Sequence, residues 1–421
     1  MRTEALDVSA PVCAGGSITS RGAVMRSASI ALAIFVAAFC LLFIRIGQRR
    51  EMVFDEQYYV GAARAFLAHA SARNVEHPPV GKYLIAAGMG RFGDNPVGWR
   101  IAPVLCGGFA LVAVFWWCEL LLENRRLALL AVLLTAANGF WFVLARTAML
   151  EIFVFTFSIW AVLAYTAALK LPCSVSVRRA LLLAAGVLFG LAVGCKWNAL
   201  VGLAVTQAIS VTLLTVGRSS LAGRNLSSAG LGCTLCALWL APALIYVAAY
   251  LPLYHAAGKP FTLADMVAMH RWMVNYHSHS PGDPALALPW YQWVIRTAPQ
   301  HAPDYLVGNI VIVWAGLVAL VVCIYRAIRR LEFAEIVIVL FYLANLLVWA
   351  IAPRPFTYYY YYGFASMFLG PMIAAAFRGV PAVFGIRPAL VLALAATVVF
   401  LGYYPAMVGL NAAWTCVLGC R

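Results

Sequence analysis

Two short polar stretches carry the residues best suited to chemistry in a chain that is otherwise mostly apolar. Residues 53–59 read VFDEQYY and place Asp55 beside Glu56, and residues 76–82 read EHPPVGK. A carboxylate can take a proton from a hydroxyl group, and a lysine can hold a phosphate. Neighbouring side chains point in different directions, so Asp55 can face a cleft while Glu56 supports it. The Pro-Pro pair excludes helix before it, which predicts a short helix that begins near Lys82.

Three further basic residues stand alone among apolar neighbours. Arg100 begins an apolar run, Arg146 lies in FVLARTAMLE, and Lys196 lies in GCKWNAL. An ionisable group in such surroundings is costly unless it has a partner or a function, although snorkelling to the membrane interface is the ordinary alternative. Glu151 follows Arg146 at about one helical turn and is its expected partner. We expect these basic groups and Lys82 to lie on one side of the membrane, where together they could surround a phosphate.

The composition is that of a membrane protein. Hydrophobic residues make up 64% of the 421 residues and charged residues 11%, against about 45–50% apolar residues in a soluble domain. Because a transmembrane helix needs about 20 apolar residues, we predict an all-α polytopic membrane protein with about eleven transmembrane helices. The predicted spans are 27–46, 97–122, 126–144, 148–169, 180–195, 198–216, 229–250, 305–325, 333–352, 356–377 and 386–407.

The distribution of Lys and Arg predicts the orientation. With the N-terminus in the cytoplasm, the short inner loops hold most of the basic residues, as the positive-inside rule requires. Asp55, Glu56 and all seven histidines then fall on the outer face. Most of the net charge of +15 serves this anchoring, so we expect no binding of nucleic acid.

The spans and polar segments divide the chain into four parts. The long polar segment 47–96 carries short interfacial helices at 58–70 and 80–91, because 58–70 has apolar residues at helical spacing. The predicted parts are a cytoplasmic tail (1–26), a catalytic transmembrane module of about seven helices that includes the external loop 47–96 (27–254), an external loop (255–304), and a C-terminal module of about four helices (305–421).

No metal site is expected. His270, His277 and His279 lie close together in the segment 255–304. Their spacing, His-x₆-His-x-His, matches no common zinc pattern, and a loop seldom holds three ligands ready.

Several motifs together resemble the protein O-mannosyltransferase family in its bacterial form. These are integral-membrane glycosyltransferases with the GT-C fold, and the similarity runs in order from about residue 28 to residue 377. The segment 255–304 has no room for the β-trefoil module of the eukaryotic members, which favours the bacterial form. The matching motifs are FDEQYY (54–59), EHPPVGK (76–82), GWRIAP (98–103), ARTAMLE (145–151), GCKWNAL (194–200) and RPFTYY (354–359).

The resemblance implies roles for particular residues. Asp55 matches the catalytic base, Glu56 its partner in the acidic pair, and Glu76 a residue that shapes the acceptor site. Arg100 matches an arginine needed for activity, and we expect it to contact the donor phosphate. By position, the expected substrate-binding residues also include His77, Lys82, Arg146, Glu151, Lys196, Trp197 and Arg354.

The implied activity is that of a polyprenyl-phosphate-mannose–protein mannosyltransferase. Such an inverting enzyme moves mannose from a polyprenyl phosphate to Ser and Thr hydroxyls of proteins on the outer face of the cell membrane, with no cofactor besides the donor substrate. The expected partners are the donor, a protein acceptor or a lipid or glycan acceptor, membrane lipids and the secretion machinery.

Two alternatives stay open. A related enzyme could transfer its sugar to a lipid or glycan, as aminoarabinose transferases do. A transporter is disfavoured because Glu119 is nearly the only charge deep inside a predicted span and no internal repeat is visible.

Overall fold

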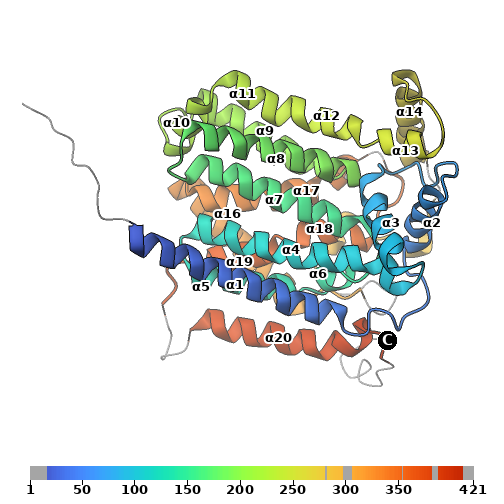
Figure 1. Ribbon diagram of the computed structural model, residues 1–421. Coiled ribbons are helices and arrows are strands. Elements are labelled where there is room, and N and C mark those ends of the chain that lie inside the picture. The colour runs from blue at the N-terminus through green and yellow to red at the C-terminus, as the bar shows by residue number, and fades with distance from the viewer. Residues whose placement is uncertain (1–16, 280–281, 297–305, 353, 382–386, 411–421) are drawn as a thin grey trace, which may run out of the picture.

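The computed structural model describes residues 17–279, 282–296, 306–352, 354–381 and 387–410. These residues form α-helices joined by short turns and contain no β-strand beyond one isolated bridge between Ala287 and Tyr358. The helices lie side by side in one bundle, with shorter helices across one end (Figure 1). The predicted all-α class is confirmed.

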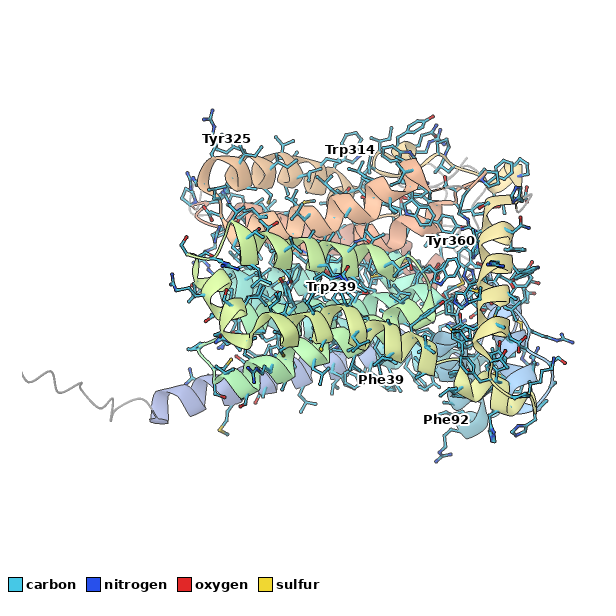
Figure 2. The ribbon with its side chains drawn as sticks, turned by 90° about the horizontal axis from the view of Figure 1, so that it is seen from above. Phe39, Phe92, Trp239, Trp314, Tyr325 and Tyr360 are labelled. Carbon is cyan, nitrogen blue, oxygen red and sulfur yellow. The ribbon has the colours of Figure 1, made fainter. Side chains whose placement is uncertain are left out.

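Eight helices in the described part of the chain are long and apolar enough to cross a membrane, so the protein is a multi-pass membrane protein. Large apolar side chains point outward from them, Trp239 and Trp314 among them (Figure 2). A ninth apolar helix, α9 (Ala199–Thr215), is shorter. The eight spans are α1 (Ser17–Phe43, apolar from Met25), α4 (Pro96–Leu122), α7 (Leu150–Lys170), α8 (Val175–Cys195), the run Leu231–Ala256, α16 (Ile310–Arg330), α17 (Phe333–Ile351) and α20 (Pro388–Met407).

The count of about eleven spans is not confirmed, because two predicted spans are broken. The segment 126–144 forms α5 (Arg125–Ala136) and α6 (Gly139–Leu144). Between them the Asn138 side chain accepts a hydrogen bond from the backbone N–H of Phe140, which caps α6 and separates it from α5. The segment 356–377 likewise forms η3 (Tyr359–Tyr361), α18 (Tyr362–Ser366) and α19 (Leu369–Ala376). The run Leu231–Ala256 comprises α11 (Leu231–Leu235), η1 (Cys236–Leu240), α12 (Ala241–Ala248) and α13 (Leu251–Ala256), and α10 (Leu221–Ala229) precedes it.

The long helices differ in how deeply they are buried in the bundle. Of the apolar window in each helix, 78% is buried in α7 and 72% in α4, but only 17% in α1 and 22% in α20. The start of α4 is well defined, because the side chain of Asn95 caps the helix and Pro96 follows as its first residue. We conclude that α4 and α7 form the core and that α1 and α20 are exposed at its edges.

Short helices cover the end of the bundle where α4 and α7 begin (Figure 1). They include α2 (Glu56–Leu67) and α3 (Val80–Phe92), close to the helices predicted at 58–70 and 80–91. The predicted loop 255–304 is wrong in one respect, because it contains a long helix, α14 (Leu263–His279), as well as η2 (Pro284–Leu286) and α15 (Trp290–Trp293). Likewise, α1 begins at Ser17, inside the predicted tail 1–26.

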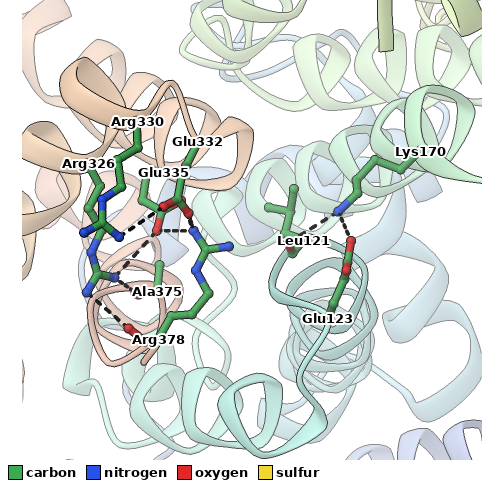
Figure 3. Close-up of polar contacts among 9 residues, drawn as sticks. All are labelled: Leu121, Glu123, Lys170, Arg326, Arg330, Glu332, Glu335, Ala375 and Arg378. Carbon is green, nitrogen blue, oxygen red and sulfur yellow. Dashed lines mark hydrogen bonds and ion pairs between the residues drawn. The ribbon is translucent and has the colours of Figure 1, made fainter. Parts of the chain in front are cut away.

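Ion pairs fasten the opposite end of the bundle, as Figure 3 shows. Arg378 forms ion pairs with Glu332 and, at 2.7 Å, with the buried Glu335. Lys170 donates to Glu123 at 2.9 Å and thereby ties the end of α7 to the end of α4. These basic residues belong to the set that predicts the cytoplasmic face, and the orientation itself stays a prediction.

Candidate active site

A cavity of about 640 Å³ lies under the short helices that cover the bundle. Its walls come from the start of α2, the turn before α3, the end of α14 and the stretch 354–361, and Tyr360 lies at this end of the bundle beside α14 (Figure 2). Four of the predicted site residues line it: Asp55, Glu76, His77 and Arg354.

Asp55 presents a carboxylate to this cavity. It stands at the N-cap of α2, where an aspartate usually accepts a hydrogen bond from the helix backbone, yet its side chain makes no such bond. Instead its Oδ2 accepts hydrogen bonds from the hydroxyls of Tyr360 at 3.0 Å and Tyr59 at 3.3 Å. Among the described residues no donor reaches Oδ1, so this oxygen can take a proton from a bound hydroxyl.

The surroundings of Asp55 make its carboxylate more basic than an exposed one. Removal from water raises the pKa of Asp55, and the negative charge of Glu151 raises it further, while Lys196 opposes both effects. The preceding residue, Phe54, has a φ of 51°, a left-handed conformation that is uncommon for residues other than glycine. Such a conformation persists where the surrounding structure imposes it, and here it stands directly before the residue that enters the cavity.

Glu56 points away from the cavity and forms a buried ion pair with Arg100. Its Oε1 accepts from Arg100 Nε at 2.8 Å and from the backbone N–H of Ala148 at 2.7 Å. Its Oε2 accepts from Arg100 Nη2 at 2.7 Å and from the backbone N–H of Val53 at 2.9 Å. In this structure carboxylate and backbone oxygens engage the Arg100 guanidinium, and Arg100 does not line the cavity, so its expected contact with the donor phosphate stays a prediction.

A second buried ion pair joins Glu151, in the first turn of α7, to Lys196, just past the end of α8. The expected pairing of Glu151 with Arg146 is thus wrong. The Lys196 ammonium also lies 5.6 Å from the centre of the Tyr360 ring and 5.4 Å from that of Tyr361. The pair does not line the cavity, but it lies directly behind the tyrosines that do, and it sets the electrostatic field at Asp55.

Three further predicted binding residues have structural contacts instead. Lys82 is buried and donates to the backbone carbonyls of Asn74 and His77, at 2.6 Å each, so it fixes the turn before α3. Arg146 donates to the carbonyl of Leu42. Trp197 donates to the hydroxyl of Tyr246 at 2.8 Å and lies outside the cavity wall.

Arg354 brings a positive charge to the cavity and holds His277 in one tautomer. Arg354 Nη2 donates to His277 Nδ1 at 2.8 Å, so Nδ1 carries no proton, and His277 Nε2 donates to the carbonyl of Glu76 at 2.8 Å. Burial, with the nearby charge of Arg354, lowers the pKa of His277 to about 4, which keeps the ring neutral. The chain Arg354–His277–Glu76 thereby joins three segments around the cavity.

The histidines of α14 do not gather around a metal position. His270 accepts from the hydroxyl of Tyr246 through Nε2 at 2.7 Å, while His279 donates to the carbonyl of Asn275. Among the described residues, no group of three His, Cys, Asp or Glu side chains could hold a metal ion.

The sequence interpretation missed several residues of the cavity wall. Arg296 adds a second arginine, and the consecutive residues Tyr358–Tyr361 form one side. A run of five tyrosines at 358–362 was visible in the sequence. We assigned it to a membrane span, whereas its break into η3 and α18 turns Tyr360 toward Asp55.

Part of the chain is similar to known mannosyltransferases. Residues 76–246 match the family model described as dolichyl-phosphate-mannose-protein mannosyltransferase. The polyprenol-phosphate-mannose–protein mannosyltransferase of Mycolicibacterium smegmatis is 30% identical over 167 residues, which cover 36% of this chain and 32% of that protein. The enzyme of the same name from Mycobacterium tuberculosis is 34% identical over 115 residues, which cover 26% and 22%. Residues 76–246 are thus similar to this mannosyltransferase family.

Solved structures extend the comparison to the fold of nearly the whole chain. The protein O-mannosyltransferase Pmt1-Pmt2 complex of S. cerevisiae, bound to its sugar donor, has a TM-score of 0.79 at 11% identity and covers 91% of this chain and 90% of that one. ArnT from Cupriavidus metallidurans, bound to undecaprenyl phosphate, has a TM-score of 0.61 at 16% identity and covers 92% and 74%. The expected GT-C fold is confirmed.

The matches to curated mannosyltransferases span about a third of those proteins' length, and Asp55 lies before the segment that the family model matches.

Proposed function

We propose that this membrane protein transfers mannose from a polyprenyl-phosphate donor to Ser or Thr hydroxyls of proteins, with inversion at the sugar. The observation that carries the proposal is the Asp55 carboxylate in the cavity wall, held through Oδ2 by two tyrosine hydroxyls while Oδ1 accepts no hydrogen bond from the described residues. The match of residues 76–246 to the mannosyltransferase family model supports this choice of reaction.

The residues of the cavity suit a single displacement. Asp55 Oδ1 takes the proton of the acceptor hydroxyl as that oxygen forms its bond to the anomeric carbon of mannose. The bond from that carbon to the phosphate oxygen breaks, and the electron pair leaves with the polyprenyl phosphate. A phosphate leaves as a stable anion, so this step needs nearby positive charge rather than an acid.

Positive charge comes from arginines that line the cavity itself. Arg354 and Arg296 can reach the phosphate, and Arg354 is fixed by its hydrogen bonds to His277 and to the hydroxyl of Tyr361 at 2.5 Å. One base and fixed cations are sufficient, in contrast to the two carboxylates that most glycosidases need. Glu56 contributes by fixing Arg100 and the start of α2, which positions Asp55.

We further propose the placement in the cell. The cavity opens on the outer face of the plasma membrane, and the N-terminus lies in the cytoplasm, as the distribution of basic residues predicts. The donor and a protein acceptor are the proposed partners, and contact with the secretion machinery stays a prediction. The fold shared with ArnT keeps a lipid or glycan acceptor as the second candidate.

Transfer from a labelled donor tests the proposal. The purified protein in lipid nanodiscs would be given radiolabelled polyprenyl-phosphate mannose, a Ser- and Thr-rich peptide, and a lipid extract. We expect label in the peptide, released by an α-mannosidase because inversion of a β-linked donor gives an α-mannoside. Label in the lipid fraction alone would favour the second candidate, and label in neither would contradict both.

A further inference from the structure

A second, smaller cavity lies at the same end of the bundle and shares no lining residue with the first. It has a volume of about 30 Å³, room for one small group and none for a sugar or a lipid chain. Four arginines line it, together with a few apolar residues and one threonine, and no carboxylate lines it. The arginines are Arg45, Arg49, Arg100 and Arg146.

The positive charges at this cavity exceed the negative ones. Glu56 neutralises Arg100 from the far side. Neither Arg45 nor Arg146 forms an ion pair with any carboxylate that the structure describes. The Nε of Arg45 is buried and has no hydrogen-bond partner among the described residues. A buried donor without a partner is destabilising, so a bound acceptor would stabilise this arrangement.

Arg146 is the most enclosed of the unneutralised arginines. Its residue surface is 7% exposed, its Nη1 donates to the carbonyl of Leu42, and its guanidinium lies 5.1 Å from the centre of the Phe142 ring. Burial lowers the pKa of Arg146 to about 10, and the charge of Arg100 contributes in the same direction. A guanidinium with that pKa is still charged at neutral pH. Arg146 is therefore a buried positive charge that no carboxylate of the described residues neutralises.

The position of the cavity indicates where its ligand comes from. Arg45 and Ile46 lie just past the end of α1, and Met407 and Val408 lie at the end of α20. Of the eight candidate spans in the described part of the chain, α1 and α20 are the least buried, with 17% and 22% of their apolar windows covered by protein. A group that enters from their surroundings comes from the lipid, at the depth where a span ends and headgroups begin.

We propose that this four-arginine cavity binds the phosphate of an anionic membrane phospholipid, whose acyl chains stay in the bilayer beside the protein. Guanidinium groups match phosphate oxygens in geometry and are weakly hydrated, which makes arginine suited to a partly buried phosphate. The bound phosphate fastens the end of α1 and the end of α20 to the turn before α7. It also adds a counter-charge beside Arg100, which positions Glu56 next to the catalytic base.

Lipid-dependent stability tests this site without any turnover, so an inactive enzyme would not affect the result. Delipidated protein in a neutral detergent would be titrated with short-chain phosphatidylglycerol, with the matching diacylglycerol, or with inorganic phosphate, and its thermal-unfolding midpoint followed. We expect phosphatidylglycerol alone to raise the midpoint of the wild-type protein. The concentration needed should rise about tenfold in Arg45→Gln and in Arg146→Gln, as loss of one charge-assisted contact predicts.

Arg50→Gln is the matched control, because Arg50 lies two residues past the turn that holds Arg45, is exposed and does not line the cavity. It should respond as the wild-type protein does. Arg45 is only partly buried, so Arg45→Gln should fold even if Arg146→Gln does not.

Four outcomes would overturn the proposal. Equal titrations of Arg45→Gln and wild-type protein would remove the phosphate site. An equal effect of inorganic phosphate would assign the cavity to the free ion, and an equal effect of diacylglycerol would leave only a contact with acyl chains. Weaker binding of polyprenyl-phosphate mannose to Arg45→Gln would make the cavity part of the donor site.

Discussion

Replacement of Arg100 by alanine separates two roles for this arginine, a contact with the donor phosphate and a support for Glu56. In the structure the side chain of Arg100 is 3% exposed and that of Glu56 is fully buried. Arg100 donates twice to Glu56 and also to the carbonyls of Ile46, Arg49 and Glu51. Arg100→Ala would therefore leave a buried carboxylate with only two backbone N–H donors.

The expected loss of stability is large. Removal of one partner of a buried ion pair costs roughly 3–5 kcal/mol, which lowers the ratio of folded to unfolded protein about 10²–10⁴-fold. The double variant Arg100→Met with Glu56→Gln should recover much of this loss, because it leaves no unpaired charge. Arg64→Ala is the control, since its ion pair with Asp94 is exposed and should contribute only about 0–1 kcal/mol.

Denaturant unfolding of the purified variants in detergent micelles gives these free energies, and binding of labelled polyprenyl-phosphate mannose gives the donor affinity of the protein that remains folded. We expect Arg100→Ala to be far less stable than Arg64→Ala and the double variant to lie between them. If Arg100→Ala unfolds like Arg64→Ala but binds the donor weakly, Arg100 is a phosphate ligand and our structural reasoning about the pair is wrong.

Three further predictions concern the charges around the cavity. Because burial raises the pKa of Asp55 above its ordinary value of 3.8, and the base must be ionised, transfer should fall with decreasing pH at values above those of an exposed aspartate. The pH at which transfer falls to half should rise in Lys196→Met and drop in Glu151→Gln, because Lys196 lowers and Glu151 raises the pKa of Asp55. A shift in the same direction in both variants would contradict Asp55 as the titrating base. Arg354→Gln should lower kcat/KM by about 10–100-fold, the loss of one charge-assisted contact, whereas the exposed Arg271→Gln should leave it unchanged in the same transfer assay. EDTA should not affect transfer, because fixed arginines are proposed to stabilise the leaving phosphate; activity lost to chelator and restored by a divalent ion would show that a metal takes part.

The sequence predicted those features that depend on local signals. The fold class follows from apolar runs of sufficient length, and so does the position of α4, which was predicted at 97–122. Asp55 was identified because an acidic pair next to an apolar span is uncommon and because its motif resembles a known family. The structure places Asp55 in the cavity, and its role as the base stays a proposal.

The partners of the buried charges could not be predicted in this way. Spacing along one chain suggests neighbours within a helix, so Glu151 was paired with Arg146 five positions away. The structure pairs Glu151 with Lys196 across 45 positions and Glu56 with Arg100 across 44. Packing of the whole bundle decides which helices are in contact, and the spacing of residues along one sequence does not predict these contacts.

The breaks within apolar segments were missed for a related reason. Hydropathy does not distinguish a continuous span from α5 and α6 joined at Asn138, or from the short elements at 359–376. The tyrosine side of the cavity depends on the second of these breaks. A polar cap residue followed by glycine, as in Asn138-Gly139, was the available signal for the first break.

Comparison of Asp55→Asn with the wild-type protein tests the central claim most directly. Both proteins would be purified, shown to unfold alike and to bind polyprenyl-phosphate mannose alike, and then assayed for transfer to a Ser- and Thr-rich peptide. Since a positioned general base contributes about 10²–10⁴-fold, we predict a loss of that size in turnover with donor binding unchanged. Turnover of folded Asp55→Asn within a few-fold of wild type would show that Asp55 is not the base.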